Sequence, residues 1–544
     1  MEIMAAVQEP CICRCGDCGR GTHRRRVLMF PMPFQGHTNP MLQLADVLHA
    51  RGLAVTVLHA TCLSAPDPER HPEFQFVPVP DGVPDHVAAS GDVLGIVHAM
   101  NAAMEADESA VLRDVLATVL GDERQPPAAC IVFDANLLAV PKAAAALGLP
   151  TLVLTTGSAA CLRSLVAYPM LHEKGYLPHQ ESKLDLPVKE LPPLRVRDLF
   201  YTSPSHQEAM RRTFARVVEA VKKSSGLVMN TFDALETAEV QMIREELNIP
   251  LVLAAGPLHK LSSKSIGSSL LEQDFSCIEW LDRYQPESVL YVSFGSLASL
   301  GSNEFLEVAW GLANSGHPFL WVVRPDLVPG LDCLDFPNDF DAAVDGRGKV
   351  IQWAPQQEVL AHAAVGGFWT HSGWNSTLES ISEGVPMICR PQFADQMMNT
   401  RYVVNTWGVG LELEGELERG KIEKVVRKLM KEKEGEEMRD RAKELKKNVA
   451  DCLKAGGTSQ MAIDKLMGNA RYVEHVWRTG LTLDGELERG KVEAAVAALM
   501  GPGEPGAGLR RRALELKSSA AECMAKHGSS WTSVDKLVDH IMTL

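Results

Sequence analysis

Residues 353–396 bring together side chains that could bind a phosphorylated ligand. Within them, the apolar run Val365–Thr370 predicts a buried strand that leads into His371-Ser372-Gly373-Trp374-Asn375-Ser376, whose polar residues we expect to cap a following helix. The first turn of such a helix exposes backbone N–H groups and carries about half a positive charge. The amides, the Ser376 hydroxyl and the His371 side chain could therefore bind a phosphate, and a diphosphate would suit the site.

Two further residues of this stretch suit the remaining parts of a nucleotide. Glu379, which we place three residues into the helix, can accept two hydrogen bonds from a sugar diol. Trp353 offers a flat ring on which a base can stack. A single tryptophan is more often a core residue, and a single serine at a helix start is usually a simple cap. Together at this spacing, however, these residues predict a site for a base, a ribose and a diphosphate.

The stretch resembles the signature box of plant family-1 UDP-glycosyltransferases, from Trp353-Ala354-Pro355-Gln356 at its start to Asp395-Gln396 at its end. The resemblance implies a UDP-sugar site in which Trp353 and Gln356 hold uracil, Glu379 holds ribose, His371, Asn375 and Ser376 hold the diphosphate, and Trp374, Asp395 and Gln396 contact the sugar. Ala354 and Gly373 belong to the same set. Only the phosphate and ribose assignments also follow, independently, from the residues at the helix terminus.

The first half of the chain alternates predicted strands and helices. The strands are expected at Val27–Pro31, Leu53–His59, Ala129–Phe133 and Thr151–Leu154, with helices near 41–51 and 138–147. This order indicates a parallel sheet wrapped by helices, in which ligands collect at the C-terminal strand ends. His37 lies in the loop 32–40 after the first strand, and Asp134 directly follows the third.

His37 and Asp134 stand at matching strand ends and could form a general-base dyad. A carboxylate that is hydrogen-bonded to one imidazole nitrogen fixes the tautomer and leaves the other nitrogen to take a proton from an alcohol. A single loop histidine is more often a solvated surface residue, but the pairing with Asp134 favours catalysis. The family resemblance implies the same dyad. It also implies that the loop Thr155-Thr156-Gly157 contacts the donor sugar, with Thr155 as the expected contact.

A second sheet is expected after a linker rich in serine, lysine and glycine. Strands at Val289–Ser293, Leu320–Val323 and Lys349–Gln352 lead into the signature box, and the loop Phe294-Gly295-Ser296 resembles a diphosphate-contacting turn through Ser296. The expected fold is α/β, with the GT-B arrangement of two Rossmann-like parallel-sheet domains facing across a cleft. The expected boundaries are a disordered extension at 1–26, an acceptor-binding domain at 27–255, a linker at 256–278, a UDP-sugar-binding domain at 279–466 and a duplicated helical segment at 467–544.

Composition excludes several other classes of function. The 544-residue chain carries a formal charge of −15, which disfavours nucleic acid and anionic membrane surfaces as partners. It lacks an apolar run of the roughly 18–20 residues that span a bilayer, and its N-terminus lacks a signal-peptide pattern. Eight of the 12 cysteines are scattered singly, which is typical of a reduced, cytoplasmic protein. We expect a monomer whose partners are a UDP-sugar and a small-molecule acceptor.

Two patterns could hold a metal, and we favour neither. Cys11, Cys13, Cys15 and Cys18 could bind zinc, but zinc sites usually join two separated ligand pairs, so a disordered extension is the preferred interpretation. Asp339-Phe340-Asp341 is a D-x-D triplet, yet a helix terminus would already neutralise the diphosphate. No cofactor is expected, and UDP-glucose is the expected donor substrate. The sequence also lacks the G-x-G-x-x-G and G-x-S-x-G motifs of dinucleotide enzymes and hydrolases.

The end of the chain contains a repeat. The features Asn399-Thr400-Arg401-Tyr402-Val403, Trp407 and 415–421 (GELERGK) recur seventy residues later at 469–473, Trp477 and 485–491. We expect the first copy, with a strand at Trp407–Leu411 and a helix at Ile422–Met430, to occupy the native sites, because it follows Gln396 without a break and so has the smaller loop-closure cost. The alternative is that the last helix, Ser533–Leu544, displaces its twin at Ser459–Leu466.

The residues and the resemblance together predict an inverting, UDP-glucose-dependent O-glucosyltransferase for a small lipophilic hydroxylated plant metabolite. Gln396 and Trp374 resemble the glucose-using members of the family. The runs Lys142–Tyr176, Pro192–Phe200 and Gly256–Ser262 resemble benzoxazinoid glucosyltransferases, while phenolic, flavonoid and cytokinin-like acceptors stay open because acceptor loops diverge fastest. The alternative is a nucleotide-sugar-binding homologue with impaired catalysis.

Overall fold

The computed structural model describes residues 25–63, 65–106, 111–201, 207–262, 271–329, 336 and 339–475, with side chains described up to Met467. The chain divides into two units, residues 1–462 and 463–544, and two parallel sheets lie in the first unit. The cysteine-rich segment 11–18 lies outside the described residues, as does the repeat beyond residue 475.

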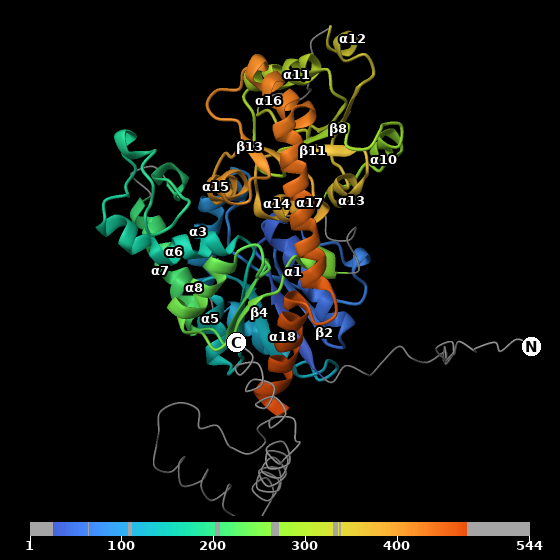
Figure 1. The fold of residues 1–544 in the computed structure, drawn as a ribbon. Helices are drawn as coiled ribbons and strands as arrows, with labels where there is room; N and C mark the ends of the chain where they lie inside the picture. The colour runs from blue at the N-terminus through green and yellow to red at the C-terminus, as the bar shows by residue number, and fades with distance from the viewer. Residues whose placement is uncertain are drawn as a thin grey trace, which may run out of the picture. The chain divides into compact units, whose positions relative to one another are not determined.

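The first sheet has seven parallel strands in the order β3-β2-β1-β4-β5-β6-β7. Figure 1 labels β2 and β4 of this sheet. Its strands are β1 Arg26–Phe30, β2 Ala54–Ala60, β3 Gln75–Val79, β4 Ala128–Asp134, β5 Thr151–Thr155, β6 Gly226–Met229 and β7 Val252–Ala254. The helices between and after them are α1 Gln35–Ala50, α2 Asp85–Ala88, α3 Val93–Glu105, α4 Val111–Leu120, α5 Val140–Ala146, α6 Ala159–Glu173, α7 Gln207–Lys223, α8 Thr237–Leu247 and α9 Leu258–Leu261, with short 3₁₀ turns at 68–70, 181–183 and 196–198.

The second sheet has six parallel strands in the order β10-β9-β8-β11-β12-β13. Its strands are β8 Val289–Ser293, β9 Phe319–Val322, β10 Gly348–Ile351, β11 Val365–Thr370, β12 Met387–Cys389 and β13 Gly410–Glu412. The helices are α10 Ser276–Leu281, α11 Ser302–Ser315, α12 Phe340–Val344, α13 Gln356–Ala361, α14 Trp374–Glu383, α15 Gln396–Arg401, α16 Arg419–Lys431, α17 Lys433–Leu453 and α18 Thr458–His475, with a π-helix at Tyr402–Thr406.

Each sheet reverses its strand order at one point, between β1 and β4 in the first and between β8 and β11 in the second. These four strands are apolar and almost wholly buried, as strands covered on both faces must be. Parallel sheets bind ligands in the crevice at such reversals. The topology therefore marks two places where functional side chains can gather, and it confirms the expected fold class of two parallel-sheet domains.

Helix α1 begins six residues earlier than expected, at Gln35 rather than Met41. The prediction of a loop up to Pro40 was wrong, because Pro40 lies inside the helix as its sixth residue. His37 thus lies in the first turn of α1, which fixes its backbone. Because Pro40 has no N–H, the Gly36 carbonyl four residues before it has no partner in the helix; its partner lies on α14, where Asn375 Nδ2 donates to it at 2.8 Å.

The predicted strand Val365–Thr370 matches β11 from end to end, but the predicted side-chain cap of the next helix was wrong. Helix α14 begins at Trp374 after Gly373, and no side chain caps it. Glu379 is consequently the sixth helical residue, one turn further along than expected. Ser372 adopts a left-handed conformation with φ of 65° and is fully buried, so it cannot act as the cap.

The first copy of the repeat forms regular structure next to β12. The strand expected at Trp407–Leu411 is β13, which begins three residues later because Trp407 still ends the π-helix. The helix expected at 422–430 is α16. At the start of α18, the Ser459 hydroxyl donates to the Gly256 carbonyl, and Arg51 donates to Gln460 Oε1 at 2.5 Å. The first copy therefore contacts the N-terminal half of the chain.

Candidate active site

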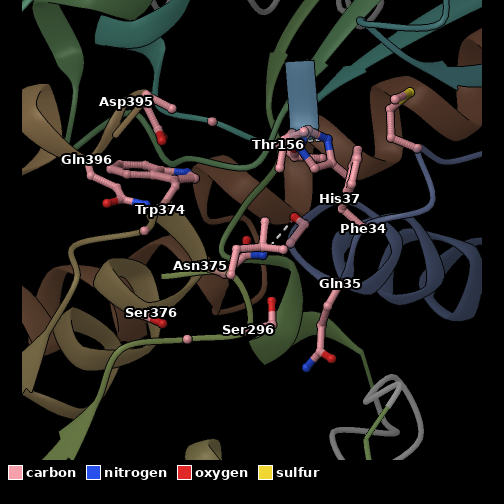
Figure 2. A pocket seen from close by; sticks show the side chains of 18 of the residues that line it. Phe34, Gln35, His37, Thr156, Ser296, Trp374, Asn375, Ser376, Asp395 and Gln396 are labelled. Atoms are coloured by element: carbon pink, nitrogen blue, oxygen red, sulfur yellow. Dashed lines mark hydrogen bonds between the residues drawn. The ribbon is translucent and has the colours of Figure 1, made fainter. Parts of the chain in front are cut away.

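One cavity of about 500 Å³ runs between the C-terminal ends of the two sheets. Figure 2 shows its side chains approaching from both halves of the chain. It is lined by every residue that the sequence analysis proposed for the site: His37, Asp134, Thr155, Ser296, Trp353, Ala354, Gln356, His371, Gly373, Trp374, Asn375, Ser376, Glu379, Asp395 and Gln396. Residues separated by more than 300 positions in the sequence thus meet in one place.

His37 and Asp134 form the expected pair. The distance between His37 Nδ1 and Asp134 Oδ2 is 2.7 Å, and the aspartate is 1% exposed, against 30% for the histidine. We place a proton on Nδ1, which then donates to the carboxylate and leaves Nε2 as the proton acceptor. The other carboxylate oxygen of Asp134 accepts from the backbone N–H and the side-chain amide of Asn136, each at 3.0 Å. Asn136, which the sequence analysis did not identify, thus holds the carboxylate in place.

The surroundings of His37 favour its protonated form. Burial alone would lower the pKa of the imidazole, but the charge of Asp134, its hydrogen bond and the charge of Asp395 outweigh burial and raise the pKa of His37 above its usual value. A proton taken from an acceptor would therefore be stabilised on this ring.

The third group at His37 is Thr156, whose Oγ1 lies 3.0 Å from Nδ1. From the sequence, its neighbour Thr155 is the expected functional threonine of this loop. Thr155 is the last residue of β5, and its hydroxyl is buried without a hydrogen-bond partner among the described residues. Sequence adjacency could not show which of the two hydroxyls turns toward the histidine.

His371 lies at the second reversal, between two glycines. A Cβ on Gly295 would lie 2.6 Å from the ring, and a Cβ on Gly373 would lie 2.5 Å from its Nε2, so only glycine fits on either side. Burial, followed by the charge of Arg324, lowers the pKa of His371 to about 4. The ring is therefore neutral near pH 7 and can donate one hydrogen bond without adding a positive charge.

Arg324 supports the loop beside His371 and was not identified from the sequence. It is 5% exposed and donates to the carbonyls of Gly295 (2.9 Å) and Ala298 (2.5 Å). In a planar trans peptide the N–H points away from the C=O, so holding the Gly295 carbonyl directs the Ser296 N–H away from the guanidinium. Ser296 lines the cavity.

Glu379 is held by two glutamine amides. Gln356 Nε2 donates to one carboxylate oxygen at 2.7 Å, and Gln357 Nε2 donates to the other at 3.0 Å. Gln356 also donates to Ser376 Oγ at 2.9 Å and accepts from the Tyr291 hydroxyl at 3.2 Å. Burial raises the pKa of Glu379, and the two amides oppose that rise. The side chain of Gln356 is therefore occupied, which leaves its backbone for a base.

The polar groups at the starts of α14 and α15 are partly occupied as well. The Trp374 indole N–H donates to the Asn230 carbonyl at 2.7 Å, so it is not available to a sugar. Gln396 Oε1 accepts from the backbone N–H groups of Gln392 and Phe393, at 2.8 and 3.2 Å. Its NH₂ group is left for a ligand. Asp395 Oδ2 accepts from Asn399 at 3.0 Å, and burial raises the pKa of Asp395.

The metal patterns gain no support from the described residues. Asp339 is the residue before α12 and Asp341 lies in its first turn, and no group of three or more potential metal ligands occurs in the described part of the chain. Among the described helices, none has both the length and the hydropathy needed to cross a membrane.

Comparisons with known proteins agree with this geometry. The family described as "UDP-glucoronosyl and UDP-glucosyl transferase" matches residues 25–445. The chain is 47% identical over 425 residues to DIMBOA UDP-glucosyltransferase BX9 of Zea mays. The aligned residues cover 77% of this chain and 90% of the relative. It is 42% identical over 442 residues to UDP-glycosyltransferase 76B1 of Arabidopsis thaliana. This alignment covers 81% of this chain and 97% of the relative.

Solved structures show the same fold. Phytolacca americana UGT2, complexed with UDP-2fluoro-glucose and pterostilbene, is 28% identical with a TM-score of 0.69 and covers 82% of this chain and 100% of that one. Os79 from O. sativa in complex with UDP is 27% identical with a TM-score of 0.68 and the same coverages. The expected GT-B fold and the expected class of enzyme are thereby confirmed. The chain belongs to the family of UDP-glucuronosyl and UDP-glucosyl transferases and is a UDP-glycosyltransferase.

Proposed function

We propose that the protein transfers glucose from UDP-glucose to a hydroxyl of a small lipophilic plant metabolite with inversion at the anomeric carbon. The observation that carries this proposal is the His37–Asp134 pair at 2.7 Å, in the same cavity as the N-terminus of α14. The base and the leaving-group site come from different sheets. That separation suits direct displacement, because the nucleophile approaches from the side opposite the departing UDP.

In this mechanism the acceptor O–H gives its proton to His37 Nε2, and Asp134 stabilises the imidazolium that forms. The acceptor oxygen bonds to the anomeric carbon while the bond from that carbon to the diphosphate oxygen breaks. The electron pair leaves with UDP. The negative charge is stabilised by the α14 amides, the Ser376 hydroxyl, the Ser296 N–H and the neutral His371 ring. One displacement converts an α-linked donor into a β-glucoside.

We assign the remaining donor contacts by the same reasoning. The half-exposed ring of Trp353 stacks on uracil, and the backbone of Ala354 and Gln356 meets its edge. The two oxygens of Glu379 keep lone pairs for the ribose hydroxyls. Asp395 and the Gln396 NH₂ group bind the sugar hydroxyls, with the buried Trp374 beneath them.

The acceptor end of the cavity is mainly apolar. Its walls come from the residue before α1, from α3, α6 and α7, and from the segment after the 3₁₀ turn at 196–198, and they include Phe34, Leu162, Leu165, Phe200, Met210 and Phe214. A few polar groups interrupt them, including His98 Nε2, which lies 3.1 Å from Thr213 Oγ1. This lining suits a flat aromatic acceptor with one or two polar groups. The maize relative named for DIMBOA makes a benzoxazinoid the first choice, with phenolic, flavonoid and cytokinin-like compounds next.

The test is turnover of UDP-glucose, UDP-galactose and UDP-glucuronate against a panel of benzoxazinoid, phenolic, flavonoid and cytokinin acceptors. NMR of the product then reports its anomeric configuration. We expect UDP-glucose to give the highest kcat/KM and the product to be a β-glucoside. An α-glucoside would contradict inversion. UDP binding without any product would favour the alternative of a homologue that binds nucleotide sugars but does not catalyse transfer.

We further propose a monomeric, cytoplasmic enzyme with an acceptor domain at 27–255, a donor domain at 279–466 and an appended segment at 467–544. The described cysteines are all unpaired, which is consistent with a reducing compartment. Light scattering at assay concentration would test the oligomeric state.

A further inference from the structure

Asn230 follows β6 and connects the two halves of the cavity. It is 2% exposed. Its backbone N–H donates to the Thr155 carbonyl at 3.2 Å, and its own carbonyl accepts from the Trp374 indole at 2.7 Å. Its side-chain oxygen accepts from the Leu258 N–H at 3.0 Å, and its amide nitrogen lies 3.5 Å from Asn375 Oδ1. All four polar groups of one buried residue thus have partners, and these lie in three segments: the end of β5, the start of α9 and the start of α14.

These partners lie both next to the proposed base and next to the proposed diphosphate site. Thr155 precedes Thr156, which contacts His37. Trp374 and Asn375 are the first two residues of α14, whose N-terminus faces the proposed diphosphate site. Leu258 begins the short helix α9, just after the first sheet ends. A shift of Asn230 would therefore move the base side relative to the leaving-group side.

Asn375 makes a second hydrogen bond to the N-terminal half of the chain, and we call its contacts with Asn230 and Gly36 the junction. Asn375 Nδ2 donates to the Gly36 carbonyl, one residue before His37. The chain of contacts therefore runs from His37 through Thr156, Thr155, Asn230 and Asn375 back to Gly36. Space around Asn230 is tight, because a Cβ on Gly256 would lie 2.7 Å from Asn230 Oδ1. The junction has little room to adapt to another side chain.

We propose that Asn230 is a positioning residue for glucosyl transfer, which sets the α14 N-terminus at the correct distance from His37 and acts together with Asn375. The inference rests on the proposed roles of His37 and α14. Asn230 itself does not need to contact either substrate. Misplacing reacting groups by about 1 Å can cost on the order of 100-fold in rate. The loss should therefore appear in kcat, while UDP still binds to a correctly folded donor half.

The decisive variants are Asn230→Asp and Asn230→Ala. Aspartate keeps the size and the acceptor oxygen but turns the donor toward Asn375 into a second acceptor, so the two oxygens would repel. We expect kcat to fall ~10–100-fold in both variants, with the Kd of UDP within about twofold of wild type. Calorimetric titration with UDP gives both the affinity and the fraction of folded sites, which normalises kcat.

Asp81→Ala is a matched control. Asp81 is also buried (3% exposed) and accepts from the backbone N–H groups of Thr61, Cys62 and Val83, but it does not line the cavity. This variant should lower the melting temperature and leave the normalised kcat unchanged. If Asp81→Ala lowers the normalised kcat as much as Asn230→Ala does, the effect is general destabilisation and the proposal fails.

The double variant Asn230→Ala/Asn375→Ala tests the coupling. If both residues maintain one junction, the two losses in kcat will not multiply, because the first change already releases it. Fully multiplicative losses, a normal kcat in Asn230→Ala, or a loss confined to UDP affinity would each overturn the proposal. Failure of the proposed function would look different: the wild type would form no β-glucoside, or His37→Ala would keep normal turnover.

Discussion

Two histidines, one at each sheet reversal, are driven to opposite protonation behaviour by their surroundings. His37 has two carboxylates nearby, which raise its pKa, whereas His371 has Arg324 nearby and is buried between two glycines, which lowers its pKa to about 4. The first can take up a proton during reaction. The second stays a neutral hydrogen-bond donor. The same residue type thus serves proton transfer in one half of the cavity and anion binding in the other.

The two halves also differ in which atoms are fixed. Around His37, side chains hold side chains: Asp134, Asn136 and Thr156 all contact one another or the ring. Around His371 the backbone is fixed instead, through the Gly295 loop on Arg324 and the uncapped start of α14. A base must be aimed at one atom, whereas a diphosphate can be held by several amides at once.

Removing the base should give the largest effect. We expect His37→Ala to lower kcat ~10²–10⁴-fold, the usual contribution of a positioned general base, with little change in the Kd of UDP. Steady-state kinetics and calorimetry on the same preparation would measure both. Near-normal turnover in this variant would remove the basis for the dyad.

Removing the ribose contact should weaken binding of the donor rather than slow the transfer step. Hydrogen bonds to a charged group contribute about 1.5–3 kcal/mol, so Glu379→Ala should raise the KM for UDP-glucose ~10–100-fold. The KM for the acceptor should stay close to wild type. Glu307→Gln is the control, because that carboxylate pairs with Arg419 outside the cavity. An equal rise in acceptor KM would show that the two halves are not separate.

The pH dependence should separate the two histidines. Because the pKa of His37 is raised, the base becomes protonated as the pH falls through that pKa, and kcat/KM for the acceptor should drop about tenfold per pH unit below it. The KM for UDP-glucose should show no step from His371 above about pH 5, since that ring is already neutral there and the diphosphate of UDP-glucose does not ionise in this range. In Asp134→Asn the loss of negative charge should move the acid limb to lower pH. A limb that moves to higher pH would contradict the electrostatic argument.

The smallest effect is expected from the repeat. Deleting 468–544 should leave the melting temperature close to that of the full chain and change the rate of glucosyl transfer less than twofold. The reason is that the first copy already contacts the N-terminal half through Ser459 and Gln460. Truncation further back, before Thr458, is the comparison that should reduce stability. Loss of both stability and activity on deleting 468–544 would assign the closing role to the second copy.

The sequence predicted the strands best where burial is complete. Val289–Ser293 and Val365–Thr370 have the predicted ends because both are short apolar runs. The start of α1 was wrong because Gly36 and Pro40 read as loop signals, and the helix tolerates both. Every proposed site residue lines the cavity, since a motif fixes its members by local spacing. The roles of those residues remain proposals.

Supporting residues were missed for a different reason. Asn136, Arg324 and Asn230 are ordinary side chains whose importance lies in their partners, and the partner of Asn230 on α14 is 144 positions away. No local pattern reports such a distance. Thr156 was passed over in favour of Thr155 because the last residue of a strand and the first beyond it point in different directions.

The proline in α1 has a consequence for how strongly the two halves of the cavity are joined. Since Pro40 cannot donate to the Gly36 carbonyl, that oxygen is left to accept from Asn375 at the start of α14. One such hydrogen bond contributes about 0.5–1.5 kcal/mol net. A residue with an N–H at position 40 would compete for the same oxygen within the helix and so weaken the contact. The ring of a proline that does not line the cavity thus strengthens the attachment of the donor half to the acceptor half.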